Sequence, residues 1–163
     1  MTDYDSTAYG ICISTAITGS GTTAYPSGDR MFFICEKVSL PIAFQQKIKD
    51  IAGGYSYSTK DGKMSMSTKF GLCILVGGRT IFNTMIPKLK DEHRAAGGLL
   101  YLFIKDLSAG TPKWENGDNT LFIGYTAAGA ETNYMSGYLL GLEPEIDGGA
   151  YYLKNITFKE CLV

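Results

Sequence analysis

Short runs of apolar residues, some continuous and some alternating with polar residues, recur along the whole chain. Continuous runs such as Met31-Phe-Phe-Ile-Cys35 and Leu99-Leu-Tyr-Leu-Phe-Ile104 are consistent with buried strands. Segments dense in turn residues, such as 18–29, separate the runs. The pattern predicts strands at 8–17, 30–38, 70–76, 99–104, 121–125, 134–142 and 150–163.

One segment repeats its apolar residues at helical spacing. Counted from Phe82, they fall at i, i+3, i+4, i+7, i+11 and i+14. Asn83 can cap the start, Pro87 is tolerated in the first turn, and Gly97-Gly98 follows the end. We therefore expect a helix over 82–96 that covers an open edge or face of the sheet. Its stripe consists of Phe82, Met85, Ile86, Leu89, His93 and Ala96.

The segment 55–68 has the pattern of a β-hairpin. Serine alternates with tyrosine before Asp61-Gly62 and with methionine after it, and Asp-Gly between two alternating runs is a strong hairpin signal. In such a ribbon the serines would lie on a face exposed to water, and the other face would carry the tyrosines or methionines. The ribbon could extend from the domain and lie on a neighbouring subunit, or equally close its own sheet. The candidate inter-subunit residues are Tyr55, Tyr57, Lys60, Asp61, Met64 and Met66.

The stretch before this hairpin is ambiguous. Ser39-Leu-Pro41 ends the preceding strand, and Gly53-Gly54 closes the segment. Between them, the apolar residues of 42–51 suit a short helix, and they suit an irregular crossing loop equally well.

The pattern of the last thirty residues predicts two strands joined by an acidic turn that ends in glycine. A terminal strand frays unless something ties it down, so this apolar strand must pair within its own domain or against a neighbouring subunit. Glu143, Glu145 and Asp147 could bind Ca²⁺ or supply two carboxylates for glycoside hydrolysis. Adjacent carboxylates in a turn splay apart and no EF-hand pattern is present. A plain hairpin connection with Asp147-Gly148 as its turn dipeptide is therefore favoured.

Composition supports a mainly β protein. The 163 residues suit one domain, 1–163, and include 20 glycines and 11 tyrosines, which favour turns and strands over a helical bundle. We expect a β-barrel or β-sandwich of about eight or nine strands with one flanking helix near residues 83–96. Only 19% of residues are charged. Such a surface is typical of subunit contacts, and it also suits an ordinary tyrosine-rich β-domain.

Charge and motifs argue against several functional classes. The net charge is −1 and no basic patch stands out, so nothing favours nucleic-acid binding. No apolar run is long enough to span a bilayer, so we expect no membrane insertion. No nucleophile motif accompanies His93, whose position on the apolar stripe favours a structural role. We expect neither enzymatic activity nor a cofactor or metal.

The four cysteines, Cys12, Cys35, Cys73 and Cys161, each lie in an apolar, strand-like run. None forms a C-x-x-C pair. The N-terminus has no signal-peptide pattern, which points to folding in a cytoplasm. We therefore expect buried thiols rather than a disulfide framework or a zinc site.

The order of elements over residues 80–163 resembles a known family. A helix leads into the strand 99–104; the strand Gly137-Tyr-Leu-Leu-Gly-Leu-Glu-Pro144 follows, and the chain closes on Tyr151-Tyr-Leu-Lys-Asn-Ile-Thr-Phe158. This half is similar to the major tail tube proteins of long-tailed bacteriophages, which share a fold with the tubes of related injection systems. In that family, a strand with the pattern G-Y-hydrophobic-x-x-L-E-P and a closing strand with hydrophobic-T-F recur.

The resemblance implies a structural protein of the virion tail, assembled in the cytoplasm of the host bacterium. Six protomers would form a ring, and rings would stack into a hollow tube that conducts DNA without binding it specifically. Partners would be further copies of the chain and other tail proteins, namely the tape measure, the terminator and, in contractile tails, the sheath. A long hairpin makes contacts between rings, and 55–70 is the best candidate for it.

Two other readings stay open. Trp114, in a polar loop, could stack on sugars in a small glycan- or ligand-binding β-sandwich, or it could be a contact loop that packs on its own domain or a neighbour. Alternatively, the chain could be another structural component of a virion.

Overall fold

The computed structural model describes residues 10–35, 38–40, 42–51, 55–70, 73–75, 78–95, 99–105, 120–126 and 128–161, with backbone alone for 42–78 and 91–95. Eleven strands and one helix lie within these residues. The strands are β1 (Ile11–Thr18), β2 (Tyr25–Cys35), β3 (Val38–Ser39), β4 (Ile42–Ile51), β5 (Tyr55–Phe70), β6 (Cys73–Leu75), β7 (Leu100–Ile104), β8 (Gly124–Tyr125), β9 (Glu131–Thr132), β10 (Met135–Asp147) and β11 (Ala150–Glu160), and the helix is α1 (Gly78–Ala95).

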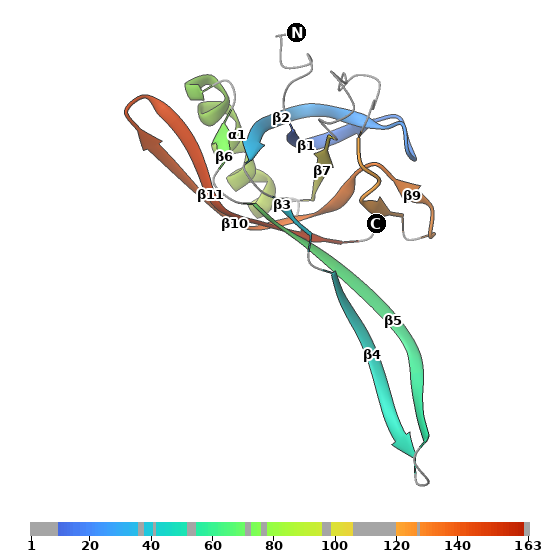
Figure 1. Cartoon of the computed structure of the whole chain (residues 1–163). Coiled ribbons are helices and arrows are strands. Elements are labelled where there is room, and N and C mark those ends of the chain that lie inside the picture. Colours follow the sequence, from blue (N-terminus) through green and yellow to red (C-terminus); the bar gives the residue numbers. More distant parts are fainter. Residues whose placement is uncertain are drawn as a thin grey trace.

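Six strands pair in a circuit, β10-β7-β1-β2-β6-β11, in which β11 also pairs with β10. All the pairings are antiparallel. The joints β7–β10, β2–β6 and β6–β11 consist of only two or three residue pairs. The sheet is therefore curled into a sandwich-like body rather than a regular barrel (Figure 1). The predicted mainly β fold with one flanking helix is confirmed.

The strands β1, β2 and β7 form the centre of the body, and both of their faces are buried over residues 11–14, 31–33 and 102–104. One face contributes Ile13, Phe33 and Leu102 to the larger core, which also contains Leu153 and Phe158 of β11. The other face carries a smaller cluster of Cys12, Ala24, Phe32 and Phe103. Burial on both faces explains why these strands are continuous apolar runs instead of alternating ones.

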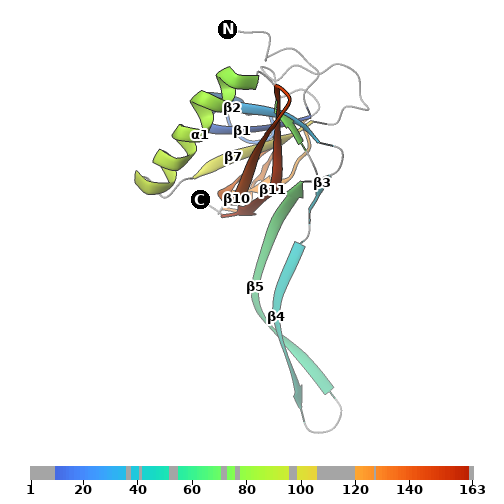
Figure 2. The same ribbon diagram turned by 90° about the vertical axis from the view of Figure 1, so that its left-hand side faces the viewer.

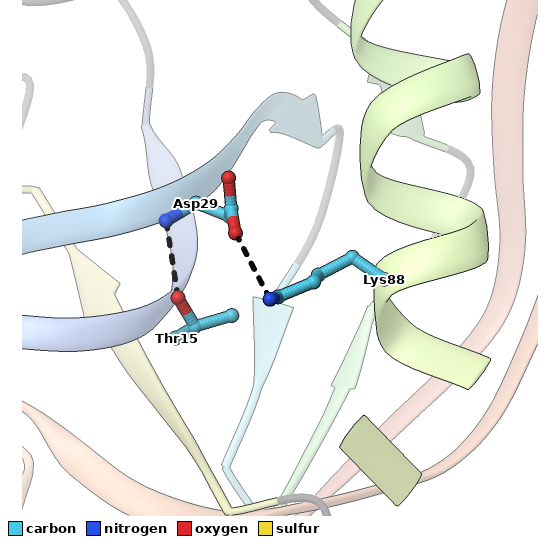
Figure 3. Close-up of polar contacts among 3 residues, drawn as sticks. All are labelled: Thr15, Asp29 and Lys88. Atoms are coloured by element: carbon cyan, nitrogen blue, oxygen red, sulfur yellow. Dashed lines mark hydrogen bonds and ion pairs between the residues drawn. The ribbon is translucent and has the colours of Figure 1, made fainter. Parts of the chain in front are cut away.

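The helix α1 lies along one side of the body (Figure 2). Met85 is fully buried in the larger core, and the ring of Phe82 lies 5.4 Å from that of Tyr151 in β11. A polar contact adds to this packing: Lys88 Nζ lies 3.6 Å from Asp29 Oδ2, and the Asp29 backbone N–H donates to Thr15 Oγ1 at 3.0 Å (Figure 3). Both charged groups are partly exposed, so apolar burial rather than this ion pair holds the helix.

The helix begins earlier than the sequence predicted. Gly78 is its first residue, so Asn83 is an exposed interior residue and not the cap, and Pro87 lies in the middle of the helix. Residues 78–80, the first turn of the helix, have no apolar side chain, so the helical periodicity could not predict that the helix begins there. Thr84 Oγ1 donates to the Thr80 carbonyl at 2.8 Å within this first part.

Three further predictions need correction. The ambiguous segment 42–51 is a strand, β4. Within 121–125, only Gly124–Tyr125 is a strand. Cys35 is disulfide-bonded rather than a buried thiol, and the residue opposite it in β6 is Cys73. Cys12 and Cys161 are thiols.

Candidate functional site

The strands β4 and β5 form a long two-stranded arm that projects away from the body (Figures 1 and 2). Among the described strands, β4 pairs with β5 alone, from Ile42↔Met66 to Ile51↔Tyr55. Only the root of β5 joins the body, where residues 67–69 pair with β11 and residues 69–70 with β3. The arm is therefore a ribbon with one attached end.

The prediction of a hairpin within 55–68 that turns at Asp61-Gly62 is wrong. β5 runs unbroken through Asp61-Gly62, and its hairpin partner is β4 instead of a second half of 55–68. The register steps from Gln45↔Lys63 to Lys47↔Thr59, which leaves three residues of β5 opposite one residue of β4. Asp61-Gly62 therefore lies in a bulge, another setting in which a strand accommodates glycine.

The half of the arm nearest the body has one apolar and one polar face. Because residues directly opposite in a ladder share a face, Ile42 and Met66 lie on the same face as Phe44 and Met64. The other face carries the pairs Ala43↔Ser65 and Gln45↔Lys63. The two strands of the arm together have five lysines and two aspartates, so the arm is basic although the whole chain is nearly neutral.

An apolar groove of about 710 Å³ lies between α1 and β10. Its most exposed apolar side chain is Leu140, with 64% of its surface accessible. Leu140 is the extra residue of a bulge, because Leu139 pairs with Phe158 and Gly141 with Thr157. The bulge interrupts the alternation, so both Leu139 and Leu140 reach the groove. The lining residues are Phe82, Ile86, Leu89, Lys90, Leu100, Leu139, Leu140, Gly141, Leu142 and Pro144.

Beyond the groove, β10 and β11 continue into a second projecting hairpin with an acidic tip. Gly148 and Gly149 have φ values of 56° and 91°, and Asp147 pairs with Ala150 across them. This is the geometry of a two-residue turn that requires positive φ at both positions. The preference for a plain hairpin connection is therefore confirmed, although its two central residues are Gly148-Gly149 rather than Asp147-Gly148.

The three acids of this tip share one face of β10, because they occupy alternate positions. Lys154 Nζ lies 2.5 Å from Glu145 Oε2, and Asn155 Nδ2 donates to Glu143 Oε2 at 2.6 Å. The hydrogen bond and charge of Glu145, with smaller contributions from Glu143 and Asp147, raise the pKa of Lys154. One lysine thus faces three carboxylates, and the tip keeps a surplus of negative charge.

Among the described residues, no group of three His, Cys, Asp or Glu is placed to hold a metal ion. Within the same part of the chain, no helix is long and apolar enough to cross a membrane.

A third exposed apolar feature follows residue 120, where Phe122 is 62% accessible. The segment is held to the body by the buried Asn133, whose Nδ2 donates to the Ala24 carbonyl and to Thr120 Oγ1, each at 2.7 Å. Asn133 Oδ1 has no partner in the structure. Trp114, the predicted contact-loop residue, lies outside the described residues.

The predicted inter-subunit residues all lie on one strand. Tyr55, Tyr57, Lys60, Asp61, Met64 and Met66 belong to β5. Sequence reasoning missed their partner strand β4, and it missed Leu140. A signal for β4 was present in Ile42 and Phe44, which alternate with polar or small residues.

Comparisons with known proteins do not assign the chain to a family. No family model matches the sequence, and no curated protein matches it significantly.

Proposed function

We propose that this chain is a structural protein that assembles with copies of itself through its β4–β5 arm. The observation that carries this proposal is a long ribbon with an apolar face that pairs with no described strand beyond its root. A two-stranded hairpin is at best marginally stable alone in water. An apolar face on such a ribbon is explained if another subunit covers it in the assembled state.

The assembly we propose is the tube of a bacteriophage tail, built from stacked rings of this chain. The resemblance of residues 80–163 to tail tube proteins supports this choice. The projecting hairpin fits it too, because such tubes use a hairpin for contacts between rings. The net charge of −1 also suits a conduit for DNA, since neutralising phosphates is what makes binding tight.

The test is the assembly state of the purified protein. We expect rings or tubes in negative-stain electron microscopy, and light scattering from particles far larger than the 17.7 kDa chain. Replacing the apolar pair Phe44 and Met64 by serine should abolish or strongly reduce these particles. The matched control replaces Ala43 and Gln45, two uncharged residues on the polar face, by serine, and it should assemble like the wild type.

A wild-type protein that stays a monodisperse monomer at high concentration would refute the proposal. If that monomer bound immobilised glycans and lost binding on Trp114→Ala, the glycan-binding function would replace it. Particles that form equally well in both serine variants would show that the arm has no part in assembly.

A further inference from the structure

We infer that the groove between α1 and β10 is the acceptor for the β4–β5 arm of a second copy of this chain. The inference rests on the proposed function, and it goes further because it names the surface on which the arm docks. The occupant is the half of the arm that carries Ile42, Phe44, Met64 and Met66 on one face.

Apolar complementarity is the first argument. Leu140 and its neighbours give the groove an apolar wall on β10, and Phe82, Ile86 and Leu89 give it another on α1. Leu140 stays 64% exposed although it borders the body. Burying apolar surface against apolar surface drives association, and the arm places Ile42, Phe44, Met64 and Met66 on one face of its ladder. A cavity of about 710 Å³ has room for more than one side chain.

Charge complementarity selects the arm as the occupant. The acidic tip begins beside the groove, since Pro144 lines the groove and Glu143 and Glu145 flank it. The arm has a surplus of three lysines over its aspartates, and the tip has a surplus of two carboxylates over Lys154. A basic ribbon seated in the groove would lie alongside an acidic one, and opposite charges on two surfaces orient their encounter.

The geometry requires two copies. In both views the arm points away from the body in the direction opposite to the turn of β10–β11 (Figures 1 and 2). The arm therefore leads away from its own acidic tip. An arm on one copy and a groove on the next are different surfaces, so the contact is head-to-tail. Contacts of this kind generate closed rings or open stacks rather than a closed symmetric dimer.

The contact uses side chains and not the addition of a strand. β10 pairs with β7 only through residues 135–137, so its further edge has no partner strand among the described residues. Pro144 lies on this edge and has no N–H to donate, and proline in a strand is a device against edge pairing. The arm therefore seats its apolar face in the groove without extending the sheet.

The test uses two variants of the whole chain, Leu140→Asp in the groove and Phe44→Asp in the arm. The control is Phe122→Asp, because Phe122 is as exposed as Leu140 but lies outside the groove. Circular dichroism and the thermal midpoint of each variant establish that it folds. In sedimentation velocity, we expect both test variants to lose the wild-type assembly and the control to keep it.

Mixing the two test variants makes the test specific. The Leu140→Asp copy keeps an intact arm and the Phe44→Asp copy keeps an intact groove, so one joint can form in a 1:1 mixture. We expect the mixture to contain a complex larger than either variant forms alone. Sedimentation of the mixture as the simple sum of its components would overturn the inference.

The outcomes separate the two proposals. If the wild type does not assemble, the proposed function itself fails. If the wild type assembles and Phe44→Asp does not, but Leu140→Asp assembles normally, the arm docks elsewhere; the groove is then not its acceptor, and the proposed function stands.

Discussion

Two hairpins project from the body in the described part of the chain, β4–β5 and β10–β11, and each contains an Asp-Gly dipeptide with a different structural role. In β10–β11, Asp147-Gly148 lies at the turn, and both turn glycines have positive φ. In β4–β5, Asp61-Gly62 lies in a bulge in the middle of a 16-residue strand. The same dipeptide therefore predicts a turn correctly in one hairpin and wrongly in the other.

The difference comes from what each hairpin is attached to. β11 pairs with β5, β6 and β10, and it contributes Leu153, Ile156 and Phe158 to the core. Its register is fixed because a slip by one residue would turn these side chains out of the core. The arm has only its internal pairing beyond its root. The register of each arm strand is therefore set only by the other strand. The Asp-Gly dipeptide within β5 forms a bulge in this pairing and does not turn the chain.

The largest expected difference in stability is between a variant that lacks most of β11 and a variant that lacks the arm. Deleting Tyr152–Val163 removes three fully buried side chains, each worth about 2–5 kcal/mol. That loss is comparable to the total stability of a domain, about 5–15 kcal/mol, so we expect no folded protein. Deleting 42–65 and closing the gap with Asn-Gly should change stability by only about 1 kcal/mol, because among the described strands this part of the arm pairs only with itself and the deletion shortens a connection.

The measurement is denaturant unfolding of both deletion variants followed by circular dichroism. A native-like monomer after loss of β11 would contradict our account of the body. An unfolded protein after loss of the arm would show that the arm is part of the cooperative fold.

A smaller difference in stability is expected between alanine substitutions at two glycines of β10. A Cβ added at Gly137 would lie 2.0 Å from the Lys159 carbonyl oxygen of β11, so the backbone of one strand would have to move. We expect Gly137→Ala to cost about 3 kcal/mol or more. At Gly141 the nearest atom would be the Asn155 carbonyl oxygen at 3.6 Å, an ordinary contact.

Gly141→Ala is therefore the matched control, and it should change stability by less than about 0.5 kcal/mol. Thermal denaturation of the two variants side by side measures the difference. Equal midpoints would mean that β10 and β11 do not approach closely at Gly137, and that the hairpin is attached to the body more loosely than described.

The smallest expected effect concerns the acidic tip. The hydrogen bond and charge of Glu145 raise the pKa of Lys154 above its ordinary value of 10.5. A raised pKa means that the folded state holds this proton more tightly. Its stabilising contribution is therefore present below pH 10.5 and is lost as the pH rises through the pKa of the folded state. Because the group is exposed, the effect on stability should be slight.

An NMR titration of the Lys154 ammonium group would measure this shift. Glu145→Gln should return the pKa of Lys154 toward 10.5, whereas Glu131→Gln, which changes an exposed acid outside the tip, should leave it unchanged. The same pKa in both variants would show that the ion pair does not persist in solution.

The pattern of residues predicted the long strands β1, β7, β10 and β11, but it missed the first part of β2, the short strand β9 and the start of the helix. Strands with both faces buried, such as β1 and β7, contain runs of apolar residues, and these runs alone predict a strand. The apolar stripe that includes Met85 and Leu89 predicted the helix. Its first turn, Gly78-Arg-Thr80, has no apolar residue, so the periodic pattern did not place these residues in the helix.

What the sequence determined by itself is the set of apolar faces, because burial leaves a periodic trace within each segment. It also determined the terminal hairpin, because Gly148-Gly149 fixes a turn locally. Only the tertiary structure decided that 42–51 is the partner of 55–70, that Asp61-Gly62 is a bulge, and that Leu140 lies in a groove beside α1. Each of these depends on a neighbour distant in sequence or on the register of an opposite strand, and such a relation leaves no periodic trace in the segment itself.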